Sequence, residues 1–402
     1  MKRVITLLVI LLFVMAGCGS GKQSDTQNDG FITVDVTAKY PKKDLILQDF
    51  LDVEYISLET SDEFVTSAQI LTIDKESMFF KNMQRGTGDI FVFDRTGKGL
   101  RKINRSGQGN EEYLSITGIV LDKENDELFV NNHHDNKILV YDQFGNFKRK
   151  FIRTGVFHYS NIGNFDQDNL ICLDGHFVGY NEPNKEELKK NYFSIMSKND
   201  GSIKEIQIPY KEKKQLYIAD AAANGTIIRI ITSIWNNELI PYKNSWILTE
   251  FSADTIYIYS QDHSMKPFIV RTPSVQSMNP EVFLSPGVLT DRYYFMHTVK
   301  KIYDSETESG FSSTDIMYDR QENAIFECVV YNDDFTNKRS ISLSYEINFG
   351  NNEIAFIKKF EAIELVEAYE KGELKGKLKE IASKLDEESN AVIMLAKYRN
   401  KK

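Results

Sequence analysis

The chain has 402 residues, of which 41% are hydrophobic and 12% aromatic, and its formal net charge is −9. The acidic balance argues against nucleic-acid binding through a basic surface. The aromatic residues are 26 Phe and 20 Tyr against only 2 Trp, a usage that favours a protein rich in β-sheet.

The first residues have the pattern of an export signal. Lys2 and Arg3 precede an apolar run at 4–14, which is too short to span a bilayer and leads to small residues just before Cys18. We therefore predict a lipoprotein signal peptide at residues 1–17, with Cys18 as the lipidated mature N-terminus. An ordinary signal peptide cut near the same point is the alternative.

Residues 18–30 contain no large apolar side chain and are predicted to form a flexible tether. The remainder, 31–402, is predicted to be one folded domain held near a membrane by the anchor. We expect an exported, lipid-anchored monomer of the cell envelope, at the outer membrane, and leave open whether it faces the periplasm or the surface.

Two segments repeat one another at a distance of 48 positions, 91–107 and 139–155. Each repeat predicts a strand, a tight turn with a glycine where positive φ is needed, and a second strand. Seven of the 17 aligned positions are identical: Val92/Val140, Asp94/Asp142, Gly97/Gly145, Arg101/Arg149, Lys102/Lys150, Arg105/Arg153 and Gly107/Gly155.

Two more short strands precede each hairpin, and four strands in about 48 residues are typical of one β-propeller blade. Weaker copies follow, so the prediction is an all-β, six-bladed β-propeller of four-stranded antiparallel blades, although the spacing would also allow seven. In the third blade the strand candidates lie between residues 160 and 208. The fourth blade has candidates at 226–232, 255–260 and 266–271, and the fifth at 292–299, 314–319 and 324–331. The sixth has candidates at 340–347 and 352–359.

The two ends of the chain supply the strands that should close the ring. Residues 53–59 and 391–398 are strand candidates without another partner, and pairing them would remove the exposed edges of an open sheet.

A helical insertion is predicted at about 361–385, where Leu374, Leu378, Ile381 and Leu385 have helical spacing. Because glycines weaken its middle, we expect one broken helix or two short ones. Covering apolar surface is the favoured role, and binding a partner is the alternative.

Two further cysteines, Cys172 and Cys328, lie inside strand-like runs far apart in the sequence. They do not form the pattern of a disulfide framework, so each is expected to pack as a small hydrophobic side chain.

The hairpin at 93–98, the loop at 107–113, the strand at 254–259 and the ending at 388–398, all behind a lipoprotein signal, carry a family resemblance. The chain resembles six-bladed β-propeller lipoproteins of Gram-negative bacteria, which are related to NHL-repeat propellers. In that family the loop typically reads GQGPGEY, whereas this chain has Asn110 and Glu111 in place of the proline and glycine. The resemblance implies a fold and a location but no catalytic residues.

The predicted blades place nearly all long connections on one face. Turns between first and second or third and fourth strands are short, as at 94–98 and 142–146. Loops between second and third strands, and crossings between blades, lie on the other face. They include the long segments 175–191, 233–245, 300–313 and the helical insertion.

The crossing at 105–113 leads into a strand and not into a helix, so we interpret it as a connection between blades and not as a phosphate loop. Candidate ligand contacts on the long-loop face are predicted from aromatic, charged and imidazole side chains. A structural role, packing between blades, is the equal alternative for Tyr113. The candidates are Arg105, Glu112, Tyr113, His133, His134, His158, Tyr159, His176 and Trp235.

The histidines also raise the question of a metal site, since imidazole suits zinc or copper. Adjacent His133 and His134 cannot easily point at one ion, and no familiar metal spacing is present, so polar loop residues are the favoured interpretation. A channel calcium is the other possibility, with oxygen ligands from Asp135, Asn136, Asn161 and Asp174.

The sequence therefore predicts a membrane-anchored propeller that binds an unidentified ligand or envelope protein through its long-loop face, without catalysis and without a cofactor. The alternative is a calcium-dependent hydrolase or lactonase with its site at the channel mouth.

Overall fold

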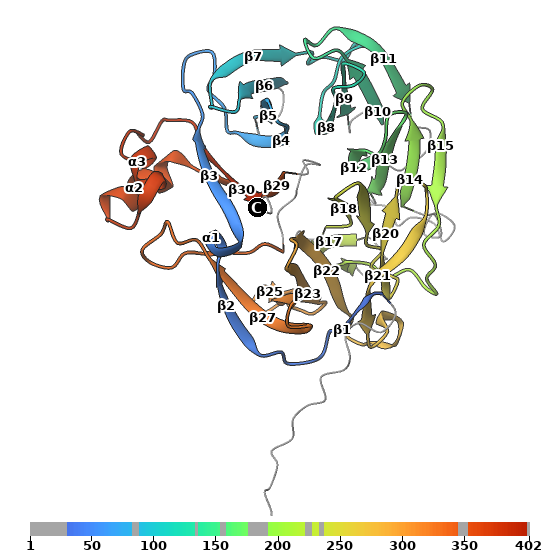
Figure 1. Ribbon diagram of the computed structural model, residues 1–402. Helices are drawn as coiled ribbons and strands as arrows, with labels where there is room; N and C mark the ends of the chain where they lie inside the picture. The colour runs from blue at the N-terminus through green and yellow to red at the C-terminus, as the bar shows by residue number, and fades with distance from the viewer. Residues whose placement is uncertain are drawn as a thin grey trace, which may run out of the picture.

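The computed structural model describes residues 30–82, 88–132, 136–152, 158–175, 192–221, 227–232, 237–344 and 353–399. Their strands form six blades arranged around a central axis, which confirms the six-bladed β-propeller (Figure 1). No helix in these ranges is long and apolar enough to cross a membrane.

Blades one to three each use four consecutive antiparallel strands, as the repeat predicts. Blade one contains β4 (Gln69–Ile73), β5 (Ser77–Lys81), β6 (Asp89–Asp94) and β7 (Gly99–Asn104). Blade two contains β8 (Ile116–Asp122), β9 (Glu127–Asn132), β10 (Lys137–Tyr141) and β11 (Phe147–Ile152). Blade three contains β12 (His158–Asn164), β13 (Asn169–Gly175), β14 (Phe193–Ser197) and β15 (Ile203–Ile206).

The later blades are less regular. Blade four contains β18 (Leu239–Tyr242), β19 (Ser245–Leu248), β20 (Thr255–Ser260) and β21 (Met265–Thr272), followed by the short 3₁₀ helix η2 (Val275–Ser277). Blade five contains β22 (Val282–Leu289), β23 (Tyr293–Lys300), β26 (Ser313–Asp319) and β27 (Ala324–Tyr331), with β28 (Ser340–Ile341) at its edge. Blade six contains β29 (Ile354–Phe360), β30 (Val392–Tyr398) and β3 (Leu51–Ser57).

Two small hairpins stand outside the blades. They are β16 (Tyr217–Ala221) with β17 (Ile227–Thr232), and β24 (Tyr303–Asp304) with β25 (Ser309–Gly310). The sequence predicts a blade-four strand at 226–232, but β17 pairs with β16 in a separate sheet, so that assignment is wrong.

Two innermost strands, β18 and β22, are not predicted from the sequence. Each contains a proline, Pro241 and Pro286, which makes the sequence look like a loop. An innermost strand has one edge toward the channel, where a missing N–H removes no ladder hydrogen bond, so proline is tolerated there. The prediction for 340–347 also needs correction, because Ser340–Ile341 pairs with blade five and not blade six.

An N-terminal strap, residues 32–57, crosses the outer edges of three blades in succession (Figure 1). β1 (Ile32–Asp35) pairs in parallel with β21, and β2 (Lys42–Ile46) pairs in parallel with β27. After the short helix α1 (Leu47–Phe50), β3 pairs antiparallel with β30. The predicted pairing of the chain ends is confirmed, whereas β1 and β2 are not anticipated by the sequence pattern.

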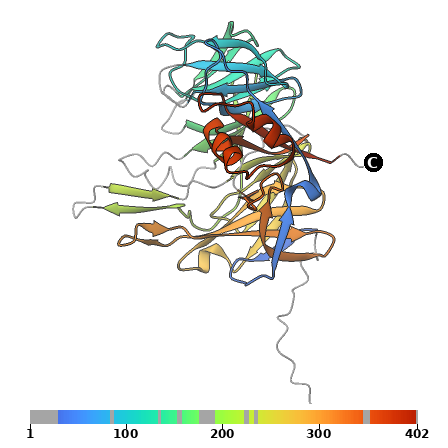
Figure 2. The same cartoon turned by 90° about the vertical axis from the view of Figure 1, so that its left-hand side faces the viewer.

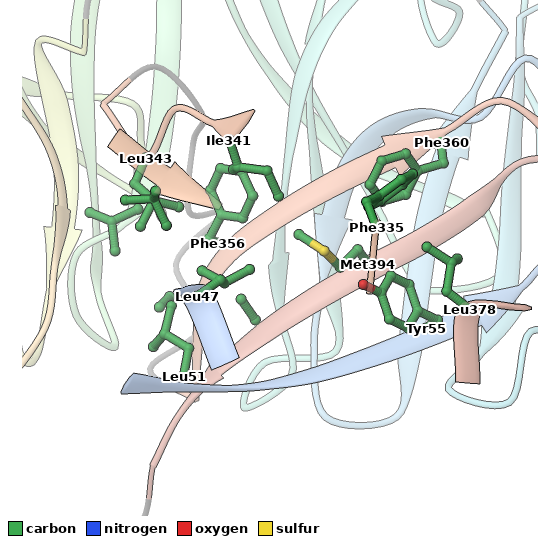
Figure 3. Packing of buried hydrophobic residues seen from close by; sticks show 14 of the residues in the cluster. Leu47, Leu51, Tyr55, Phe335, Ile341, Leu343, Phe356, Phe360, Leu378 and Met394 are labelled. Carbon is green, nitrogen blue, oxygen red and sulfur yellow. The ribbon is translucent and has the colours of Figure 1, made fainter. Parts of the chain in front are cut away.

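The strap is fixed to blade six by a large hydrophobic cluster (Figure 3). Leu47 and Leu51 are buried beside Phe356, and Tyr55 lies near Met394. Burying one such side chain contributes about 1.5–3 kcal/mol, so the cluster is a major source of stability at the closure.

Two short helices, α2 (Ala362–Glu370) and α3 (Gly376–Ala382), form the predicted insertion between β29 and β30. Gly372 has φ +70° and ends the first helix, as a left-handed residue does after a helix C-terminus. Leu365 and Leu378 are fully buried in the same cluster as the strap. The insertion therefore covers apolar surface of blade six.

The repeated residues join each blade to the next. Asp94 and Asp142 cap their turns by accepting hydrogen bonds from two backbone N–H groups each. Arg101 Nε donates to Gln143 O at 3.0 Å, and its repeat Arg149 donates to Lys198 O at 3.1 Å. Both arginines thus bond the outer strand of one blade to the outer turn of the following blade.

The turn glycines make the matching contact. Gly145 has φ +88°, and a Cβ there would lie 2.6 Å from Ile103 of the preceding blade. Gly97, with φ +91°, is packed in the same way against the carbonyl oxygen of Ser57, the last residue of β3. The strap strand β3 therefore contacts the turn of blade one in the same way as β7 contacts the turn of blade two.

A buried carboxylate holds the middle of the strap. Asp319 of β26 is fully buried and accepts hydrogen bonds from Lys43 of β2 at 3.0 Å and from Arg292 at 2.9 Å. Burial by itself raises a carboxyl pKa, but the hydrogen bonds from Arg292 and Lys43 outweigh it and lower the pKa of Asp319 to about 2.

Replacing Asp319 by Asn should lower the free energy of unfolding by roughly 3 kcal/mol, because it leaves two cations without their buried partner. Urea unfolding of the mature Cys18→Ser chain, followed by tryptophan fluorescence, measures the change.

The pKa of Asp319 is depressed in the folded state, so its contribution to the free energy of unfolding of the wild-type protein depends on pH. That contribution is present above pH 4 and is lost as the pH falls toward 2, by roughly 2 kcal/mol. Glu322→Gln is the matched control: this half-exposed carboxylate also contacts Lys43 but should contribute less than about 1 kcal/mol. Equal losses in the two variants would contradict the assignment.

Replacing Gly97 by Ala should destabilise the protein by about 3 kcal/mol, because the new Cβ is strained at positive φ and meets the backbone of Ser57. Gly118→Ala is the control, since that glycine lies in β8 where an added Cβ would have nothing within 4 Å, and it should change stability by less than about 0.5 kcal/mol. Urea unfolding of both variants provides the comparison, and an unaffected Gly97→Ala protein would rule out this close contact.

Candidate functional site

The two faces of the propeller differ in the length of their connections, but the predicted long loop at 233–245 is wrong. Leu239–Tyr242 forms β18, and the turn that joins it to β19 lies on the short-turn face. The short-turn face carries compact connections such as 243–244 between β18 and β19. The opposite, long-loop face carries the hairpins β16–β17 and β24–β25, which project in the same direction in the side view (Figure 2). Both hairpins of the described residues therefore lie on this face.

The predicted contact loop at 105–113 is a blade crossing held by hydrogen bonds. Glu112 accepts a hydrogen bond from Gly109 N at 2.7 Å, and Arg105 Nε donates to Gly145 O at 2.6 Å. Tyr141 of blade two donates to Glu111 O at 2.7 Å. The crossing is thus bonded to blade two, and no helix follows it, which agrees with a blade connection.

Tyr113 is buried between blades one and two, with 1% of its surface exposed. Its hydroxyl donates to Gly88 O at 2.8 Å and accepts from Arg105 N at 3.1 Å, and its ring meets Tyr141 edge-on. Burial raises the pKa of Tyr113 to about 12. These contacts agree with the alternative role of Tyr113, packing between blades, and a ligand contact by this residue stays a prediction.

The other predicted contacts are only partly within the described residues. Tyr159 of β12 is buried, and its backbone carbonyl accepts a bond from Asn131 at 2.8 Å. The side chain of His158 is not described, and four candidates lie outside the described residues altogether: His133, His134, His176 and Trp235. Within the described ranges no group of three His, Cys, Asp or Glu side chains is placed to hold a metal ion. The metal and calcium hypotheses stay predictions for the loops that motivated them.

A central cavity of about 850 Å³ lies along the innermost strands β4, β8, β12 and β18. Its wall includes Asn161, one of the residues considered for calcium, and Trp246, whose ring packs against Gly163. Lys75 and Glu353 form an ion pair of 3.0 Å at its edge. Hydroxyl and amide side chains predominate among the polar lining residues: Thr72, Thr117, Ser160, Asn161, Asn164, Gln167, Asn244, Ser245 and Gln261.

This lining determines what the cavity could hold. Amide and hydroxyl groups both donate and accept hydrogen bonds, so they suit a polar ligand without a large net charge. Three of the strands in this wall, β4, β8 and β12, match the predicted first strands of blades one to three, whereas β18 is not predicted from the sequence.

A carboxyl with a shifted pKa lies near the long-loop face between blades three and four. Glu250 accepts two hydrogen bonds of 2.8 Å from Lys213, whose ammonium group lies 3.7 Å from the centre of the Tyr192 ring. Burial, followed by the charge of Glu250, raises the pKa of the neighbouring Glu238 to about 7. Glu238 can therefore change charge near neutral pH.

A Ser–His–Asp row was also missed by sequence reasoning. Ser285, His297 and Asp315 lie directly opposite one another on β22, β23 and β26. Ser285 and His297 are 0% exposed, Ser285 Oγ accepts from Asn237 N, and Asp315 accepts from Ser342. A catalytic serine must be reached by substrate, so this buried row is a polar element of the core and not an active site.

The comparisons with known proteins agree with this architecture. No curated protein matches the chain. A solved structure of a Bacteroides fragilis protein described as exported has a TM-score of 0.60 at 14% identity, over 92% of this chain and 100% of that chain. A DUF4221 family member from Bacteroides vulgatus has a TM-score of 0.45 at 9% identity, over 88% and 100% of the respective chains. At such identity, the first likeness supports the propeller fold alone.

A family model described as a domain of unknown function, DUF4934, matches residues 31–397. The match spans all six blades and the strap, and so the chain belongs to the DUF4934 family.

Proposed function

We propose that the protein is an exported, lipid-anchored propeller that binds a ligand or protein partner through its long-loop face, without catalysing a reaction. The projection of the hairpins β16–β17 and β24–β25 from that face carries the proposal (Figure 2). Projecting loops on a rigid scaffold are the usual place for recognition, because they vary without disturbing the core.

The tip of the β24–β25 hairpin indicates the kind of partner surface. Asp304, Glu306 and Glu308 are exposed there, together with hydroxyl side chains. Hydrogen bonds from the backbone N–H groups of Glu306 and Thr307 lower the pKa of Asp304, so the tip stays negatively charged. A basic partner surface would complement it, with association that weakens as salt increases.

The proposed anchor is compatible with an accessible face. The strap begins with β1 at the outer edge of blade four, so a tether arriving there meets the rim of the propeller (Figure 1). Lipidation at Cys18 and a location at the outer membrane are parts of this proposal and rest on the sequence alone.

The anchor proposal predicts that Cys18→Ser moves the protein from the membrane fraction to the soluble extracytoplasmic fraction, because the lipid chains supply the attachment. Cell fractionation and immunoblotting measure the distribution. Ser20→Ala, a change two residues further along the tether, should leave the protein on the membrane. Continued tight membrane association of the Cys18→Ser chain would refute the anchor.

The binding proposal predicts position-dependent crosslinking in intact cells. A photo-crosslinking amino acid at Glu306, on the hairpin, should give a discrete adduct that is lost when residues 303–310 are replaced by a short turn. The same amino acid at Gln321 is the matched control, because Gln321 is exposed at the other end of β26 on the short-turn face. An adduct from Gln321 and none from Glu306 would contradict the proposal, because it would place partner binding on the short-turn face.

A further inference from the structure

A second cavity lies on the short-turn face, where the strap meets the end of the chain. This strap pocket, about 380 Å³ in volume, is bounded by Phe50, Tyr242, Leu289 and Tyr398, with Lys243, Arg292 and Arg399 around it. Its residues come from α1, from the first turns of blades four and five, and from the end of β30. The volume is within the range of small-molecule sites, which is roughly 300–1,000 Å³.

The walls of the strap pocket are apolar and held in place. The Phe50 ring stacks on Phe295 at 5.6 Å and meets Tyr293 edge-on at 5.3 Å. Tyr242 shares a hydrogen bond of 3.2 Å with the Tyr294 hydroxyl, and Leu289 is buried. A ligand entering between these side chains would therefore find a formed apolar surface and would spend little free energy on ordering it.

Three of the four charged residues that line the pocket are cations, and the fourth is Asp291, although the chain as a whole is acidic. Arg292 is bonded to Asp319 and lies over the Tyr293 ring, and Arg399 is paired with Asp52 at 3.2 Å. Lys243 differs from these two: it is exposed and makes no ion pair with a residue in the described ranges. Its ammonium group is the cation available to a ligand.

The position of Lys243 is also fixed by the backbone. It has φ +54° in the two-residue turn between β18 and β19, and its ammonium group lies 5.2 Å from the centre of the Tyr242 ring. The turn thus places one positive charge next to the aromatic wall.

From this combination we infer that the strap pocket binds a small amphipathic carboxylate, with its apolar body between Phe50, Leu289 and Tyr398 and its carboxylate at Lys243. An anion of this kind satisfies both the apolar wall and the cation. Lys243 also borders the central cavity, whose wall is partly apolar too, but Phe50, Leu289 and Tyr398 line the strap pocket alone. The site lies on the face opposite the projecting hairpins, so it is independent of the proposed partner site and either can fail without the other.

Calorimetric titration of octanoate into the mature Cys18→Ser chain tests the inference, with octanamide as the neutral analogue. Octanoate should bind at least about tenfold more tightly than octanamide, the difference expected for one charge-assisted contact. Lys243→Asn should abolish that preference, because asparagine tolerates positive φ but carries no charge, and Lys243→Arg should retain it.

Lys98→Gln is the control, since Lys98 is an exposed lysine on the short-turn face of blade one and lies outside the pocket. It should leave octanoate affinity unchanged. The inference is overturned if octanoate does not bind at millimolar concentration, if octanamide binds equally well, or if Lys243→Asn and Lys98→Gln have the same effect. Circular dichroism of each variant verifies that the blades are intact.

Discussion

Closure of the ring by the N-terminal strap is the constraint on which the other features depend. A propeller is stable only if its last blade meets its first, and here β3 supplies the outer strand of blade six through its pairing with β30. The same strand receives the turn glycine of blade one, Gly97, just as β7 receives Gly145 and β11 receives Gly201 through Phe151. The strap therefore completes blade six, and it also supplies the contact between blade six and the turn of blade one. Because β1 and β2 continue this pairing onto blades four and five, opening the ring requires the loss of hydrogen bonds and buried apolar surface across half of the molecule.

The internal repeat has a physical explanation in these contacts between blades. Asp94 and Asp142 organise the turn, the positive φ of Gly97 and Gly145 lets the turn approach its neighbour, and Arg101 and Arg149 bond to the backbone of the next turn. All three residue types serve the same junction. Positions within the strands need only be apolar and of suitable size, which many residues satisfy. The repeat is consequently strongest where a specific backbone geometry is required and faint elsewhere.

What could be predicted from the sequence follows from how local each feature is. Hairpins in blades one and two are encoded within a few residues, by turns with Asp and Gly three positions apart. The two short helices are encoded by the helical spacing of their leucines and isoleucine and by Gly372. The innermost strands of blades four and five were missed because Pro241 and Pro286 are acceptable only at an edge that the sequence does not reveal. β1 and β2 pair in parallel with strands more than 200 positions away, and nothing local specifies such partners. For the site, the long connection predicted at 300–313 indicated the face that carries β24–β25, whereas β16–β17 was not foreseen. The row Ser285–His297–Asp315 depends on strand register and could not be read in advance.

Closure also links the strap pocket to the stability of the fold. Phe50 belongs to the strap, Tyr242 and Lys243 belong to blade four, and Tyr398 ends β30, the strand that pairs with β3 in blade six. The pocket therefore exists only when the ring is closed. Arg399 reinforces this arrangement, since its guanidinium donates to the backbone carbonyls of Gln48 and Asp49 in the strap. A ligand that binds the closed state and not the open one stabilises it by RT ln(1 + [L]/Kd), which is about 2.7 kcal/mol at a ligand concentration of 100 Kd. A small carboxylate in this pocket would therefore act on the same junction as the strap itself, by joining the first, middle and last parts of the chain.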